Sequence, residues 1–178
     1  MRLIPTTTFR IQAPAGEAAG AGPFGLTTVT TDELFAAKRV VAFAVPGAFS
    51  PTCSARHLPG YEELHDDFRT VGVDAVYCLA VNDPFVMAAW GRALNIEKVG
   101  LLPDGNGEFT RKMGMLVEKG NLSCGLRSWR YAMFVEDRVI TRIFVEDGFA
   151  DNAPDDPFEV TGADAMLNYL HNWREPLP

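Results

Sequence analysis

The sequence contains little cysteine: three residues in 178, with no Cys-x-x-Cys pair and no spacing typical of metal ligands. An odd number of widely separated cysteines, Cys53, Cys78 and Cys124, does not form a closed framework of disulfides. Cysteines used in this way are typical of proteins from reducing compartments, so we expect the chain to act in the cytoplasm.

Positive charge is also scarce. Sixteen Lys and Arg residues stand against 23 Asp and Glu, giving a formal net charge of −7 and a pI near 4.9. Nucleic acids and anionic membranes attract basic surfaces, so this balance argues against both as partners. No apolar run reaches the length of a membrane span, and the first residues, Met1 to Thr6, lack the apolar centre of a signal peptide.

Apolar residues, in contrast, are plentiful enough for a substantial core. They make up 47% of the chain, and the mean hydropathy is close to zero. With 178 residues and no internal repeat, the sequence predicts one globular domain that spans residues 1–178.

The most informative stretch is a strand pattern followed by a helix start. Residues 40–45 form an unbroken apolar run typical of a central buried strand. After a Pro-Gly turn, Ser50 suits the N-cap and Pro51 the first helical position. Cys53 then falls in the first helical turn, where free backbone N–H groups and the helix dipole favour a thiolate over a thiol. This arrangement activates sulfur; the alternative is that Cys53 is a small buried apolar residue.

The rest of the chain alternates strand and helix patterns. Residues 7–11 and 26–29 predict an N-terminal β-hairpin, and Thr30 with Glu33 forms a capping box for a helix that runs to about Lys38. Further predicted elements are a helix kinked at Pro59, a strand at 73–81, a helix from Asp83 and Pro84, a strand at 99–102, a helical turn at 108–113, a hairpin of 129–135 with 139–144, a polar loop at 147–157 and a last helix at 163–172 capped by Thr161 and Asp164. This order is typical of an α/β, thioredoxin-like fold with a mixed central sheet flanked by helices.

The stretch around Cys53 also resembles a known family. Pro46-x-x-x-Ser50-x-x-Cys53 resembles the active-site signature of peroxiredoxins, Pro-x-x-x-Thr/Ser-x-x-Cys, with serine keeping the hydroxyl of the commoner threonine. The string PGAFSPTCS is similar to the type II, or Prx5-like, subfamily, and the likeness extends from about residue 26 to 171. The chain is similar to the peroxiredoxin half of bacterial peroxiredoxin–glutaredoxin hybrids. The other matching blocks are residues 57–60, 80–87, 103–109 and 127–131.

The resemblance implies a thiol-dependent peroxidase without metal, haem or flavin. Its chemistry needs a thiolate, donors that hold the peroxide in line, and positive charge for the transition state. Cys53 supplies the sulfur, the Ser50 hydroxyl holds the peroxide, and Pro46 shields the sulfur from water. Arg130 matches the active-site arginine of the family, whereas Arg127 is interpreted as a surface or supporting residue.

Two other residues near Cys53 in sequence or pattern leave alternatives open. His57 lies one helical turn after Cys53, which permits a Cys/His hydrolase pair, although a packing or pocket role fits better because the spacing supplies no oxyanion hole. Cys78 follows Cys53 by 25 residues, and some plant members of the subfamily use such a cysteine to resolve the sulfenic acid. Its apolar strand favours a buried, inert thiol instead. Cys124 lies in a polar stretch and is expected to be exposed.

The predicted function is reduction of hydrogen peroxide and small alkyl hydroperoxides through a sulfenic acid on Cys53. Glutathione and glutaredoxin are the expected reductants. The alternatives are a thioredoxin-dependent cycle with Cys78 as resolving cysteine, and a redox sensor or disulfide-relay protein that acts through Cys53. The resemblance also implies a homodimer, with Phe49 as a candidate contact.

Overall fold

A computed structural model describes residues 2–13 and 22–173, so most of the loop expected at 14–23 lies outside the described residues. The helices are α1 (Thr31–Phe35), α2 (Leu58–Glu63), α3 (His65–Thr70), α4 (Pro84–Ala93), α5 (Glu108–Lys112) and α6 (Ala163–Asn172). The strands are β1 (Arg2–Leu3), β2 (Thr8–Gln12), β3 (Leu26–Thr30), β4 (Arg39–Val45), β5 (Ala75–Ala80), β6 (Gly100–Pro103), β7 (Leu116–Glu118), β8 (Leu126–Ser128), β9 (Tyr131–Glu136) and β10 (Val139–Val145). A π-helical turn, Cys53–His57, leads into α2.

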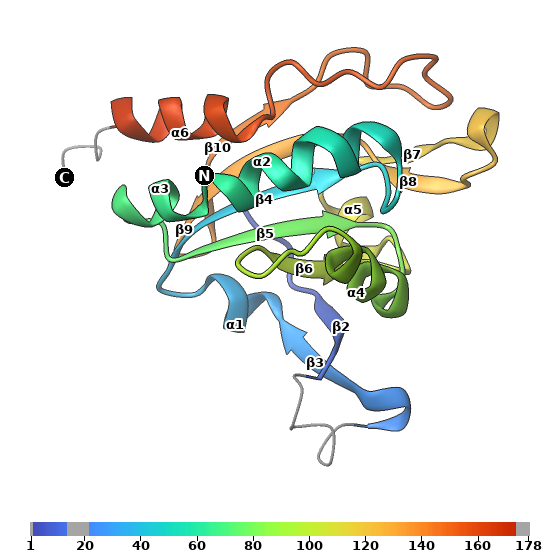
Figure 1. The fold of residues 1–178 in the computed structure, drawn as a ribbon, viewed down its shortest axis with the longest axis horizontal. Coiled ribbons are helices and arrows are strands. Elements are labelled where there is room, and N and C mark those ends of the chain that lie inside the picture. The colour runs from blue at the N-terminus through green and yellow to red at the C-terminus, as the bar shows by residue number, and fades with distance from the viewer. Residues whose placement is uncertain (1, 14–21, 174–178) are drawn as a thin grey trace.

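The main sheet has six strands in the order β1-β10-β9-β4-β5-β6 (Figure 1). Strand β4 runs parallel to β5 and antiparallel to β9, and β5 runs parallel to β6. This mixed sheet confirms the predicted thioredoxin-like fold. The apolar run of the sequence forms β4, which is buried along its length apart from its first residue because neighbouring strands and both helical layers cover it.

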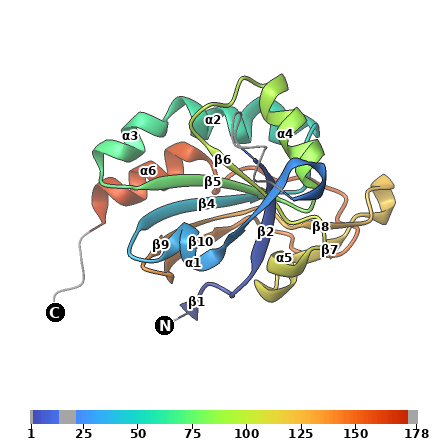
Figure 2. The same ribbon diagram turned by 90° about the horizontal axis from the view of Figure 1, so that it is seen from below.

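The two faces of β4 belong to two separate hydrophobic clusters. Val41 and Phe43 pack in the cluster that includes α2, α3, α4 and α6. Val40 and Ala42 pack in the other cluster with α1 and α5. Figure 2 shows the four helices on one side of the sheet and the two short ones on the other. Alternation along the strand therefore fills both layers of the core.

The predicted N-terminal hairpin is confirmed as β2 paired antiparallel with β3. The capping box after it is also present: the backbone N–H of Glu33 donates to Thr30 Oγ1 at 3.2 Å, and that of Thr30 donates to Glu33 Oε2 at 2.7 Å. Helix α1 is shorter than predicted and ends at Phe35, because Ala36 is extended and Ala37 has a positive φ of 54°.

Four features differ from the sequence-based expectation. Strand β1 forms the edge of the main sheet and pairs with β10, and β7 pairs with β8 in a small separate hairpin. The predicted strand at 129–135 begins later, at Tyr131, because the Trp129 N–H donates to the Met115 carbonyl beside that hairpin. The N-cap of α6 is Gly162, without a side-chain cap, so the predicted Thr161–Asp164 cap is wrong.

Thr161 misses the cap because its hydroxyl donates to a different carboxylate. Glu146, at the end of β10, accepts hydrogen bonds from the backbone N–H groups of Glu159, Val160 and Thr161 and from the Thr161 hydroxyl at 2.7 Å. Burial opposes ionisation of this carboxyl group, but the hydrogen bonds outweigh it and hold its pKa below the ordinary value. Glu146 therefore fastens the connection between β10 and α6.

We expect Glu146→Gln to lower the free energy of unfolding by about 1–3 kcal/mol at pH 7, because three N–H donors lose their carboxylate. The folded pKa is depressed, so this stabilisation is complete above the ordinary value of 4.5 and is lost as the pH falls through the folded value. Denaturant titrations at pH 7 and pH 3.5 measure the difference. Glu159→Gln, on the exposed side of the same connection, is the control. If Glu146→Gln lowered the free energy of unfolding equally at both pH values, the stabilisation would not come from the ionised carboxylate of Glu146.

Candidate active site

The cysteine predicted to be reactive lies where β4 passes into a helix. The Ser54 N–H donates to the Ser50 carbonyl at 3.0 Å, so Ser50 occupies the N-cap position and helix begins at Pro51. Cys53 is in the first turn, whose backbone N–H groups have no intrahelical acceptor. Its side chain is fully buried. The Ser54 hydroxyl accepts a hydrogen bond from the Trp90 indole at 3.0 Å, which ties this turn to α4.

The helix after Cys53 is irregular before Pro59. The Leu58 N–H donates to the Cys53 carbonyl, which is the i→i+5 bond of a π-helical turn. The kink predicted at Pro59 therefore takes the form of a wider turn just before it. Proline lacks an N–H and crowds the carbonyl four residues back, and the extra residue in the turn gives that ring room.

Two hydrogen bonds hold the turn before the helix. The Ala48 N–H donates to Asn82 Oδ1 at 2.9 Å, and the Ser50 hydroxyl donates to the Gly47 carbonyl at 2.7 Å. Phe49 has a φ of 61° and is 57% exposed. Pro46, at the start of the turn, is half-buried. Sequence reasoning did not assign a role to Asn82, which follows β5 and braces the turn from the neighbouring strand.

The structure brings Arg130 to Cys53 through the sheet. Arg130 precedes β9, whose first residue Tyr131 pairs with Ala44 near the end of β4. Antiparallel pairing thus places the start of β9 beside the turn that carries the cysteine. Arg130 is only 1% exposed, and its Nη1 lies 3.6 Å from Cys53 Sγ. A permanently charged guanidinium therefore faces the sulfur.

His57 completes the inner contacts of this arginine. Arg130 Nη1 donates to His57 Nδ1 at 3.0 Å, while His57 Nε2 donates to the Thr161 carbonyl at 3.1 Å. Because Nδ1 accepts, the proton of the neutral ring is on Nε2. Burial first, and then the charge of Arg130, lower the pKa of His57 well below 6.5 against the opposing bond to Thr161. A neutral imidazole whose lone pair already accepts from arginine cannot serve as the base of a Cys/His hydrolase pair.

Two residues of the connection between β10 and α6 form the outer side of the site. Asp156 Oδ1 accepts from Arg130 Nη2 at 2.5 Å. The Phe158 ring lies 5.6 Å from the Arg130 guanidinium carbon and 4.8 Å from the His57 ring. The sequence predicted a polar loop at 147–157, which includes Asp156, and assigned no role to Phe158; a loop carries no periodic signal that points to its contacts.

The second candidate arginine has a supporting place. Arg127, on β8, is half-buried, and its Nη1 donates to the Val81 carbonyl at 2.6 Å. Val81 precedes Asn82, whose side chain holds the active-site turn. Arg127 thus braces the backbone behind that turn, as its interpretation as a supporting residue predicts.

The other cysteines occupy different environments. Cys78 is fully buried in β5, paired in register with Phe43 of β4. Burial and the nearby Cys53 raise the pKa of Cys78 well above 9.0, against the effect of Arg130, so its thiol stays protonated. Cys124 is exposed on the connection between β7 and β8.

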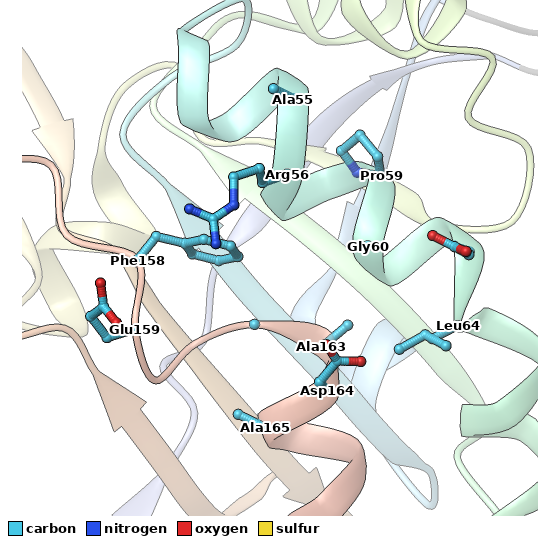
Figure 3. A pocket seen from close by; sticks show the side chains of 12 residues that line it. Ala55, Arg56, Pro59, Gly60, Leu64, Phe158, Glu159, Ala163, Asp164 and Ala165 are labelled. Carbon is cyan, nitrogen blue, oxygen red and sulfur yellow. The ribbon is translucent and has the colours of Figure 1, made fainter.

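A cavity of about 610 Å³ lies beside the site, between α2 and the start of α6 (Figure 3). Arg56 is placed over the Phe158 ring, with its guanidinium carbon 4.7 Å from the ring centre. Phe158 therefore contacts one arginine of the cavity and one arginine of the sulfur site. The lining residues are Ala55, Arg56, Pro59, Gly60, Glu63, Leu64, Phe158, Glu159, Gly162, Ala163, Asp164 and Ala165.

Two kinds of feature are absent from residues 2–13 and 22–173. Within these ranges, no group of three or more His, Cys, Asp or Glu side chains is arranged to hold a metal ion. Over the same residues, no helix has the length and apolar character needed to cross a bilayer.

Known proteins match this chain along most of its length. The Redoxin family model matches residues 12–167. A peroxiredoxin of Synechocystis sp. is 52% identical over 173 residues, which cover 97% of this chain and 92% of that protein. The hybrid peroxiredoxin hyPrx5 of Haemophilus influenzae is 52% identical over 142 residues, covering 80% of this chain and 57% of that protein.

A solved peroxiredoxin structure is also similar to this chain. Reduced Prx3 from Vibrio vulnificus, crystallised in complex with H₂O₂, superposes with a TM-score of 0.83 at 39% identity and covers 95% of this chain and 96% of its own. The family model, the sequence relatives and this structure indicate the same family. The chain therefore belongs to the Redoxin family and, within it, to the Prx5-like peroxiredoxins, which are thiol-dependent peroxidases.

Proposed function

We propose that Cys53 is the residue that reacts with peroxide and that the substrates are hydrogen peroxide and small alkyl hydroperoxides. The observation that carries this proposal is the 3.6 Å approach of the buried Arg130 guanidinium to Cys53 Sγ. A thiolate at a helix start, next to a fixed positive charge, has the character of a reactive rather than a structural cysteine.

In the proposed reaction, the Cys53 thiolate attacks one oxygen of the peroxide. The S–O bond forms as the O–O bond breaks, and the electron pair leaves on the second oxygen as hydroxide or alkoxide, which takes a proton. The sulfur is oxidised to sulfenic acid, and the peroxide is reduced to water or an alcohol. Negative charge spreads from sulfur to the leaving oxygen during this step, so a fixed cation lowers the barrier.

The side chains around the sulfur suit these needs. Arg130 Nε is buried and has no hydrogen-bond partner in the described part of the chain, which leaves a donor free for a peroxide oxygen. Ser50 already donates its hydroxyl hydrogen to Gly47, so its oxygen is left to accept from the hydroperoxide. Pro46 is half-buried at the same turn and limits access of water.

We propose glutathione as the first reductant. Cys53 sulfenic acid and glutathione give a mixed disulfide and water; the thiolate of a glutaredoxin then attacks the glutathione sulfur and releases Cys53. Two observations support this: the similarity to the hybrid peroxiredoxin hyPrx5, and the burial of Cys78, which leaves it a poor nucleophile. All three cysteines are unpaired, which suits the cytoplasm as the proposed compartment.

Peroxide treatment in the presence of glutathione should give one glutathione adduct, on Cys53, detected by mass spectrometry. Cys78→Ser and Cys124→Ser should each keep turnover with glutathione and glutaredoxin within about twofold of the wild type, because neither thiol enters the cycle. The alternative cycle predicts a Cys53–Cys78 disulfide with peroxide alone, and loss of thioredoxin-dependent turnover in Cys78→Ser. That result would replace glutathione by thioredoxin in the proposal.

We also propose that the protein forms a homodimer through the active-site turn. Phe49 supports this because its ring is 57% exposed on a turn that is otherwise well anchored. Light scattering at micromolar concentration should give the mass of a dimer for the wild type, and Phe49→Asp should shift it toward the monomer. Phe24→Asp, which changes an exposed phenylalanine next to β3, is the control and should leave the mass unchanged. A monomeric wild type contradicts the proposal.

A further inference from the structure

We propose that Asp156 is a positioning residue for the reaction with peroxide: its carboxylate fixes the guanidinium plane of Arg130 toward the Cys53 sulfur. This inference rests on the proposed role of Cys53 and adds a residue that neither the active-site motif nor the sequence patterns single out. Asp156 has an exposed side chain, yet its partner is among the most buried residues of the chain.

The geometry gives the guanidinium two opposite anchors. Nη1 donates to His57 Nδ1 at 3.0 Å and lies 3.6 Å from Cys53 Sγ, and Nη2 donates to Asp156 Oδ1. A guanidinium is rigid and planar, so contacts at both terminal nitrogens fix its orientation. Nε then remains free in the buried site. Without Asp156, the group can rotate about its remaining bond to His57 and move away from the sulfur.

Asp156 also persists as a partner when the sulfur changes charge. In the proposed reaction Cys53 attacks as a thiolate, and its negative charge then partly balances Arg130. In the sulfenic acid or the mixed disulfide the sulfur is neutral, and a buried cation without a counter-charge is unfavourable. Among the residues that the structure describes, Asp156 is the carboxylate paired with Arg130. It therefore keeps the arginine in place in each oxidation state of the cycle.

The connection that carries Asp156 is also held by contacts other than the Asp156–Arg130 ion pair. Glu146 binds the backbone of Glu159, Val160 and Thr161, and Phe158 packs between the two arginines, as Figure 3 shows for Arg56. Loss of the Asp156 carboxylate should thus disturb Arg130 without releasing the connection. Because Arg130 is buried, removal of its counter-charge can lower stability, so each variant is checked for folding by circular dichroism before its rate is measured.

The test measures the second-order rate of Cys53 oxidation by hydrogen peroxide, by stopped flow across pH, in Asp156→Ala, Asp156→Asn and Asp155→Ala. We expect the limiting rate at high pH to fall about tenfold in Asp156→Ala, because a displaced group loses its alignment. Asp156→Asn should recover to within about threefold, because its amide oxygen still accepts from Nη2. Asp155→Ala, the neighbouring exposed carboxylate, should match the wild type.

The thiolate absorbance separates positioning from ionisation. Absorbance recorded across pH shows where the sulfur is fully ionised in each variant. A slower reaction of Asp156→Ala at full ionisation then reports misplacement of Arg130. If Asp156→Ala does not fold by circular dichroism, Asp156→Asn and Asp156→Glu decide, and both should react within about threefold of the wild type.

The inference is wrong if Asp156→Ala reacts within twofold of the wild type, or if Asp156→Asn is as slow as Asp156→Ala. A wild-type protein whose Cys53 does not react with peroxide would instead overturn the proposed function itself. An active wild type with an unaffected Asp156→Ala variant removes the positioning role alone.

Discussion

Cys53→Ser should lower peroxide consumption by more than about 10³-fold, to the uncatalysed background, because removal of the attacking group abolishes the step that all others support. A serine hydroxyl is not ionised near neutral pH and is a poor nucleophile toward oxygen. The fold should survive, because serine is of similar size and favourable near a helix start. Consumption of hydrogen peroxide with glutathione and glutaredoxin, together with a circular dichroism spectrum, measures both outcomes.

Cys124→Ser is the matched control for this substitution. It makes the same chemical change at an exposed site away from β4 and should leave activity and fold unchanged. A folded Cys53→Ser protein that still turns over peroxide would move the reactive sulfur to another residue and overturn the proposed site.

The second large effect is expected at Arg130. Arg130→Ala should reduce the rate of Cys53 oxidation by about 10²–10³-fold, the range seen when one fixed donor to a developing negative charge is removed. The oxidation rate of Arg130→Lys should lie between those of the wild type and Arg130→Ala. Lysine keeps the positive charge but loses the planar contacts to His57 and Asp156.

Arg127→Ala tests whether the effect is specific. Its guanidinium bonds to the Val81 carbonyl behind the turn, so the variant should slow oxidation by less than about tenfold, through a small shift of the turn. A larger loss at Arg127 than at Arg130 would reverse the assignment of the two arginines.

Local sequence patterns predicted the central elements well, because apolar runs and helix-start residues are signals that lie within each element. The apolar runs became β4 and β5, and the Asp83-Pro84 helix start is present, with Asp83 Oδ1 accepting from Phe85 and Val86. Strand β1 could not be predicted in this way: two exposed residues form it only because β10 offers an edge. The α6 cap was misplaced because Glu146, 15 residues earlier, binds the Thr161 hydroxyl.

The candidate site also contains residues that the sequence predicted and residues that it did not. The structure brings together Pro46, Ser50, Cys53 and Arg130 at the end of β4, where the strand pattern and the family resemblance placed them. Asn82 and Asp156 were missed. Each acts through one hydrogen bond to a residue 34 or 26 positions away, and such a pairing leaves no trace in periodicity or local spacing.

The distance along the chain between Cys53 and its partners has a consequence for synthesis. Arg130 follows Cys53 by 77 residues, and the Thr161 carbonyl that orients His57 follows that histidine by 104. At the usual pace of translation, about 5–20 residues per second, the cysteine is made roughly 4–15 s before Arg130. During that interval the nascent chain carries Cys53 without the guanidinium that faces it in the folded protein. Under the proposed reaction, Cys53 of the nascent chain should therefore react with peroxide more slowly than Cys53 of the folded protein.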